Sequence, residues 1–249
     1  ITNNTGHKLP TSYPSRRMWL HTKVTDNTGA TVFESGAVDN NGKISKDTNF
    51  TAYKCLEIHK QPDAASFDSV AEGCYEPHRD IITSSDQVAI YEGVLGDVNQ
   101  DITHVLLHAR QYLKDNRIPP KGWTLAGQHV NPADSDIMDD GIVGILDGNS
   151  NLTIVDDDSN FAPGKDGAGS DGTDTVTYHV DVTGFNGPFN VEVKLYYQTI
   201  KPSFVYGMHA DDDEHFVESN SYVARFKAMY EETPPVTETL ANVSASGIN

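Results

Sequence analysis

Residues 5–36, TGHKLPTSYPSRRMWLHTKVTDNTGATVFESG, decide the fold of this chain. Side chains in the run 18–25 alternate between two faces, with Met18, Leu20, Thr22 and Val24 on one and Trp19, His21, Lys23 and Thr25 on the other. A period of two with one apolar face is typical of a strand that packs one side on a core. The turn-forming residues 26–29 follow, so residues 31–35 are predicted to return as the antiparallel partner of a hairpin.

Three later stretches also have the composition of strands, namely residues 87–95, 175–182 and 189–200. The glycine-containing loop 184–188 is predicted to join the last two into an antiparallel hairpin. In the last strand, the side chains expected to face the core are those of Val191, Val193, Leu195 and Tyr197.

Residues 101–114 and 221–231 carry apolar side chains at helical spacing and are predicted helices. With the strands, they predict a mainly β protein: an antiparallel β-sandwich, immunoglobulin-like or jelly-roll-like, with two short helices and long acidic loops. We expect a single domain over residues 1–249, elaborated by insertions at about 37–86 and 121–173. A division into two lobes near residue 118 stays open as an alternative.

Composition narrows the range of partners and compartments. The chain has 249 residues and a formal net charge of −18, so nucleic-acid phosphates would repel it and we expect no nucleic-acid partner. No apolar run is long enough to span a membrane. An acidic, turn-rich chain suits an extracellular or periplasmic surface, or one that collects divalent cations. Cys55 and Cys74, the two cysteines of the chain, are expected to form one disulfide in an oxidising compartment.

Several stretches together resemble the haem-free β-domain at the C-terminal end of many multihaem c-type cytochromes. Those domains open with a pattern like TGHxxPTGxPxRRxWLxVxVxDxxGxxVxxSG, which residues 5–36 follow closely. The resemblance continues, in the family's order, at residues 87–97, 112–120, 174–178 and 187–198. The chain differs from the cytochromes in having no Cys-x-x-Cys-His motif, so it has no site for covalent attachment of c-type haem.

The resemblance implies a non-catalytic, extracytoplasmic β-sandwich module of an electron-transfer system. Such a module would act in scaffolding, docking or filament assembly, with a multihaem cytochrome domain or like subunits as partners. Two alternatives stay open: a calcium-stabilised structural subunit of an extracellular filament without a redox role, and a copper- or zinc-binding redox domain. For catalysis, the sequence contains no Gly-x-Ser-x-Gly motif and no glycine-rich phosphate loop, and we expect no enzyme.

His7 lies in the loop Gly6-His7-Lys8-Leu9-Pro10 and is the candidate axial ligand of a haem. By the resemblance, a histidine of this kind would reach a haem of an adjacent domain, so the haem must come from another domain or chain. The alternative is a structural histidine that hydrogen-bonds within its own loop.

Two groups of residues are candidates for metal binding. Oxygen-bearing side chains in the acidic loops are calcium candidates, and they are Asp97, Asn99, Asp101, Asp134, Asp136, Asp139, Asp140, Asp147, Asn149, Asp156 and Asp158. His104 and His108 are spaced four apart on the predicted helix 101–114, and His209 and His215 flank the acidic run 211–214. Imidazoles with carboxylates suit a transition metal such as zinc.

The two ends of the chain indicate an assembly. Residues 1–4 look like the end of a strand, and the tail after Thr237 is predicted to be extended, with Val236, Leu240 and Val243 among polar residues. An unpaired sheet edge readily accepts a strand from another chain. We therefore expect a homo-oligomer or a part of a larger assembly, joined through the termini.

Overall fold

The computed structural model describes residues 1–11, 13–40, 42–44, 75–76, 78–98, 102–123, 170–215 and 221–248. It gives only the backbone for Gln111, for residues 209–215 and for Ser221. The predicted disulfide between Cys55 and Cys74 lies outside the described residues.

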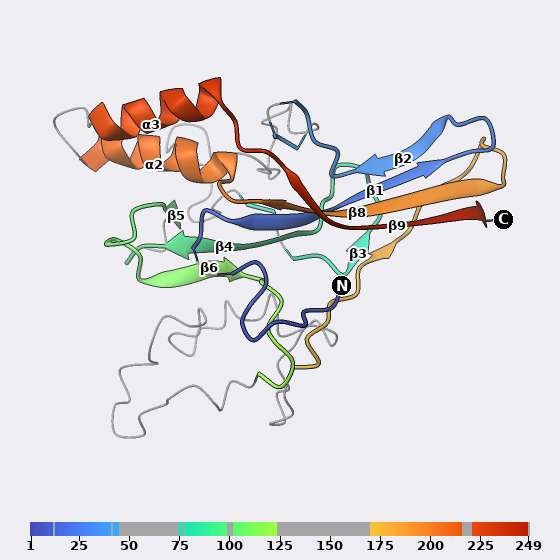
Figure 1. Ribbon diagram of the computed structural model, residues 1–249, viewed down its shortest axis with the longest axis horizontal. Helices are drawn as coiled ribbons and strands as arrows, with labels where there is room; N and C mark the ends of the chain where they lie inside the picture. Colours follow the sequence, from blue (N-terminus) through green and yellow to red (C-terminus); the bar gives the residue numbers. More distant parts are fainter. Residues whose placement is uncertain are drawn as a thin grey trace, which may run out of the picture.

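One antiparallel sheet dominates the molecule and runs in the order β5-β4-β1-β8-β9, with β2 beside β1 and β6 beside β4 (Figure 1). Its strands are β1 (Arg17–Thr25), β2 (Thr31–Ser35), β4 (Ile90–Gly96), β5 (Ile102–Thr103), β6 (Gln111–Asp115), β8 (Phe189–Gln198) and β9 (Glu238–Ile248). A separate parallel pair consists of β3 (Ile81–Ile82) and β7 (Thr177–Tyr178). The helices of the described part, α2 (Pro202–His215) and α3 (Ser221–Glu232), lie together beyond one end of the sheet. The mainly β, antiparallel fold with two helices is therefore confirmed.

β1 is the central strand of this sheet. All nine of its residues pair with β8, from Arg17 opposite Gln198 to Thr25 opposite Asn190. Its other edge is divided between two strands: residues 17–19 pair with β4 and residues 22–25 pair with β2. The predicted hairpin of residues 18–25 and 31–35 is thus confirmed.

The two faces of β1 contribute to different cores, as the alternation of its side chains predicts. On one face Met18, Leu20 and Val24 join a cluster with the buried Ile82 and Tyr91, and the partly buried Val191, Val193 and Leu195 of β8 pack against it. On the other face Trp19 packs with Ile44, Val88 and Ile90. A strand that is buried on both sides is well suited to fix the register of its neighbours.

The predicted helix over residues 101–114 is wrong. The segment instead forms β5, a turn at residues 106–108, and β6, both strands pairing with β4. Leu106, which lies on the apolar face of the predicted helix, is 46% exposed. Pairing with both edges of β4 satisfies backbone groups of this segment and overrides its helical spacing.

The predicted hairpin between residues 175–182 and 189–200 is also wrong in its pairing. β8 forms within the second stretch, but its partners are β1 and β9. β7, from the first stretch, pairs in parallel with β3. The helix predicted at residues 221–231 is confirmed as α3, whereas α2, which includes the acidic run 211–214, was not predicted from the sequence. The extended tail after Thr237 is the strand β9.

Gly36 closes the hairpin against β1 and tolerates no side chain. Its φ is +73°, and a Cβ at this position would overlap the carbonyl oxygen of Leu20 and crowd Trp19. The indole Nε1 of Trp19 donates a 3.0 Å hydrogen bond to the carbonyl oxygen of Gly36. Gly29, in the turn before β2, also has a positive φ, +85°, but its Cβ position is open.

We predict that Gly36→Ala lowers the free energy of unfolding by about 3 kcal/mol or more, since it combines a strained backbone with an overlap in the core. Gly29→Ala is the matched control, because it carries the backbone strain alone and is expected to cost about 1 kcal/mol. Urea unfolding of both variants measures the difference. Equal losses for the two would mean that the close approach of Gly36 to β1 contributes nothing.

Candidate functional site

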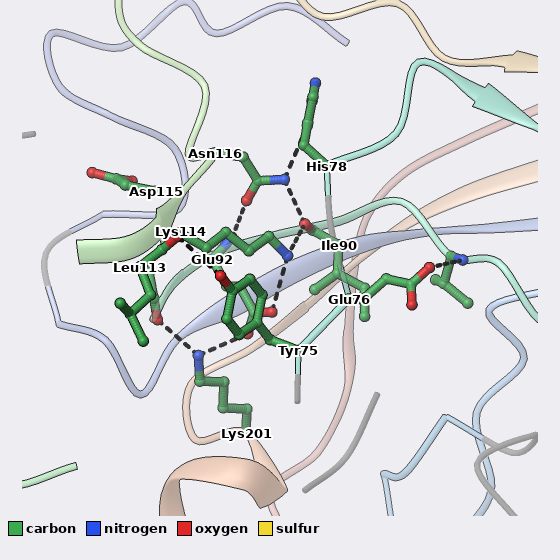
Figure 2. A network of polar contacts seen from close by, with 12 residues as sticks. Tyr75, Glu76, His78, Ile90, Glu92, Leu113, Lys114, Asp115, Asn116 and Lys201 are labelled. Carbon is green, nitrogen blue, oxygen red and sulfur yellow. Dashed lines mark hydrogen bonds and ion pairs between the residues drawn. The ribbon is translucent and has the colours of Figure 1, made fainter. Parts of the chain in front are cut away.

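A buried ionic cluster surrounds the carboxylate of Glu92 on β4. Lys114 of β6 places its Nζ 3.1 Å from Oε1, and Lys201, just before α2, places its Nζ 2.7 Å from Oε2 (Figure 2). All three side chains are at most 3% exposed. The two ammonium groups also donate to main-chain carbonyl oxygens, Lys114 to Ile90 at 3.0 Å and Lys201 to Gly93 at 2.9 Å. Burial lowers the pKa of Lys201, and the charge of Glu92 opposes this shift.

Asn116 extends this cluster along the backbone of β4. Its Oδ1 accepts a hydrogen bond from the amide of Glu92 at 2.9 Å, and its Nδ2 donates to the carbonyl oxygen of Ile90 at 2.7 Å. The same Nδ2 lies 3.1 Å from His78 Nδ1 (Figure 2). Arg17 of β1 stands opposite Glu92 in the β1–β4 register, and its Nε donates to Gln198 at 2.9 Å. The cluster thereby connects β1, β4, β6, β8 and the start of α2.

Among the described residues, the cavity beside this cluster is too small for a substrate. The cavity that Lys201 lines, together with His104 and Phe204, has a volume of about 10 Å³, which is roughly the space of one water molecule. A buried lysine beside a carboxylate is an arrangement also found in catalytic sites. Here the described residues leave the amine no access to a ligand, so its chemistry serves the fold.

The loop that carries His7 is tethered on both sides of that residue. Asn3, which is 1% exposed, donates its Nδ2 to the carbonyl oxygens of His7 and Ile118 at 2.8 and 2.9 Å. Leu9 and Ile118 exchange two backbone hydrogen bonds of 2.9 and 2.8 Å. The His7 side chain is exposed, and its Nδ1 lies 3.3 Å from Thr5 Oγ1. The chain thus presents this imidazole from a loop whose backbone is held in place.

A second buried ionic group anchors the same loop. The carboxylate of Asp115 lies 2.7 Å from Lys8 Nζ and 2.6 Å from Arg117 Nε. Burial alone would raise the pKa of Asp115, but the charge of Lys8 and the hydrogen bonds and charge of Arg117 outweigh it and hold the pKa below its usual range. The loop therefore depends on an ionised Asp115.

The other predicted ligands are not brought together. The turn at residues 106–108 removes the helical spacing that His104 and His108 were expected to have. His104 is buried against α2, where Gly207 leaves room for its ring, and His108 is exposed. His209 and His215 both fall on the backbone of α2, and their side chains lie outside the described part.

Of the calcium candidates, Asp97 is described and follows β4. The other ten lie outside the described residues, and they are Asn99, Asp101, Asp134, Asp136, Asp139, Asp140, Asp147, Asn149, Asp156 and Asp158. Within the described ranges, no group of three or more histidine, cysteine, aspartate or glutamate side chains is arranged to hold a metal ion.

The polar face of the long strands pairs its own charges. His21 stacks on Tyr196 with ring centroids 5.7 Å apart, and its Nε2 lies 3.0 Å from Glu34. Lys194 and Glu192, neighbours on β8, form a 3.0 Å ion pair. This face has no unbalanced charge of its own among these residues with which to attract a ligand.

β9 is the most exposed element of the sheet. Each of its eleven residues is exposed, and no described strand pairs with its outer edge (Figure 1). Exposed apolar side chains gather on it and just before it, at Val236, Leu240, Val243 and Ile248. An open edge with apolar side chains is the arrangement by which sheets accept further strands, so β9 is the candidate binding site.

No protein-family model, curated protein or solved structure matches this chain. Among the helices in the described part of the chain, none combines the length and the apolar character that crossing a membrane requires.

We predict that Glu92→Gln lowers the free energy of unfolding by about 3–5 kcal/mol, because it leaves the charges of Lys114 and Lys201 buried without their carboxylate. Glu34→Gln is the matched control: its partly exposed pairs with His21 and Lys23 are expected to be worth about 1 kcal/mol or less. Urea unfolding at neutral pH compares them. A loss for Glu92→Gln no larger than for Glu34→Gln would show that the cluster is not a main source of stability.

We predict a pH-dependent contribution from Asp115. Its folded pKa lies below the ordinary value of about 3.9, so its stabilisation is complete above that value and is lost as the pH falls through the folded pKa. The difference in unfolding free energy between the wild type and Asp115→Asn should therefore be constant between about pH 5 and 7 and shrink below about pH 4. A difference that does not change down to pH 2 would contradict the assignment.

Proposed function

We propose that this chain is a non-catalytic, extracytoplasmic β-sheet module that acts in docking or filament assembly for a multihaem cytochrome electron-transfer system. The observation that carries the assembly role is the exposure of β9. A strand of eleven residues is exposed along its whole length and carries apolar side chains, while the buried ionic groups serve the fold. Proteins usually blunt such an edge with charges or proline, and β9 carries one charge, at Glu238, and no proline.

Contacts between two of the stretches that resemble the cytochrome domains support the link to a cytochrome. The stretch 5–36 supplies β1, the His7 loop and Gly36, and 112–120 supplies Lys114, Asp115 and Asn116. These two stretches meet through the Lys8–Asp115 ion pair and the backbone bonds of Leu9 and Ile118. Residues that carry the resemblance thus support one another physically around an exposed histidine, which suits a module that sits beside a haem domain.

The test is to purify the native assembly through a tag on this chain and to record its absorption spectrum. We expect bands of c-type haem in constant proportion to this chain. An assembly without haem absorbance would contradict the electron-transfer role and favour the structural subunit of an extracellular filament.

We predict that His7→Ala changes the haem spectrum of that assembly from low-spin to high-spin character at one haem, since an axial ligand is lost. The matched control is His179→Ala, because His179 is also exposed but lies just after β7. Both variants are expected to unfold within about 0.5 kcal/mol of the wild type. If His7→Ala leaves the spectrum unchanged, His7 is not an axial ligand and its role is structural, within its own loop.

A further inference from the structure

We propose that β9 pairs with β9 of a second copy of this chain, antiparallel and centred on Val243, so that two sheets join into one. This deepens the proposed function and rests on it, because it names the partner that the exposed edge accepts.

Two bulges define the part of β9 that can pair regularly. Leu240 is an extra residue between the partners of Leu195 and Tyr196, and Gly247, with φ +73°, is an extra residue between the partners of Phe189 and Asn190. Between them, residues 241–246 pair with β8 without interruption. Bulges twist a strand and end its pairing, so the regular edge extends over these six residues.

The side chains of this window alternate in character. Ala241, Val243 and Ala245 stand opposite Leu195, Val193 and Val191 and continue the apolar face of the sheet. Asn242, Ser244 and Ser246 stand opposite Lys194, Glu192 and Asn190 on the polar face. The window carries no charge and no proline, and Val243 is 66% exposed.

Residues 241–245 of this window are self-complementary when the sequence is reversed. In an antiparallel pair centred on Val243, Ala241 meets Ala245 of the second copy, Asn242 meets Ser244, and Val243 meets itself. Directly opposite residues lie on the same face of a sheet, so apolar side chains meet apolar ones and polar side chains meet polar ones. A twofold contact requires a patch that fits itself in this way.

The effect of salt on binding distinguishes a second copy of this chain from a cationic partner. Each chain carries a formal charge of −18, so two copies repel over long range, whereas the contact itself is uncharged. Salt screens the repulsion and leaves the contact intact, so dimerisation should strengthen with ionic strength. A cationic partner strand would bind less well as salt is added.

Sedimentation equilibrium of the purified chain of residues 1–249 tests the proposal. We expect the mass to rise from 27.2 kDa towards twice that value with concentration, and the rise to be steeper at about 0.5 M salt than at about 0.02 M. Val243→Lys places two lysines opposite each other and should raise the dissociation constant about tenfold or more. Val236→Lys is the matched control, since Val236 is 73% exposed and precedes β9.

A cysteine at position 243 reports the register independently of the effect of lysine on folding. Opposite residues of an antiparallel pair have Cα atoms about 4.5–5.5 Å apart, within the range of a disulfide. Mild oxidation of Val243→Cys should join two copies of the peptide that contains Cys at 243, and Val236→Cys should give no such product.

A chain that stays monomeric at all concentrations would overturn the proposal, as would a dimer that Val243→Lys weakens no more than Val236→Lys does. A monomer that still enters a haem-containing assembly would overturn this inference alone and leave the proposed function in place. An assembly without haem that contains the Val243-centred dimer would overturn the proposed function and leave this inference in place.

Discussion

A single buried carboxylate, that of Glu92, holds the parts of this protein in their relative positions. A carboxylate out of contact with water is stable only where cations and donors reach it with good geometry. Lys114 comes from β6 and Lys201 from the start of α2, so both elements must be in place before the charge is compensated. The cluster therefore couples the end of the sheet to the helices, although none of the apolar clusters of the described residues contains all of these elements.

Polar side chains carry out much of the positioning elsewhere as well. Asn3 holds the His7 loop through four hydrogen bonds, and Asp115 anchors it from the other side. Buried polar groups that are satisfied in only one arrangement favour a unique structure more than they favour stability. These polar contacts, together with the packing of Leu9 against the core, explain how a loop that carries an exposed imidazole keeps a defined backbone.

Local sequence patterns are sufficient to predict a strand where its side chains alternate between two packed faces. The run 18–25 and its return at 31–35 were predicted within a residue because alternation and turn chemistry agree there. The segment 101–114 has apolar residues at helical spacing, such as Val105, Ala109 and Leu113, but its pairing with β4 determines its structure. The pairing of β7 with β3, and the helix α2 in an acidic run, depend on contacts between distant residues that no local pattern records.

For the candidate site, one signal in the sequence was overlooked. Glu92 falls on the same face of its strand as Val88 and Ile90, which indicates a buried charge that needs partners. The identity of Lys201, 109 residues away, could not be read from the sequence. The tail was predicted to be extended, but its pairing with β8, and hence its role as the edge of the sheet, follows from the structure.

The pairing of β1 with β8 also has a consequence for how the chain folds. Arg17 and Gln198, which face each other in the sheet, are 181 residues apart in the sequence. Contacts between such distant residues slow folding, because a long loop must close before the contacts can form. During synthesis, the central strand emerges first and waits for most of the chain to follow. In that interval the edges and both packed faces of β1 are open to other chains, so this protein should fold slowly and depend on chaperones to protect the hairpin of β1 and β2.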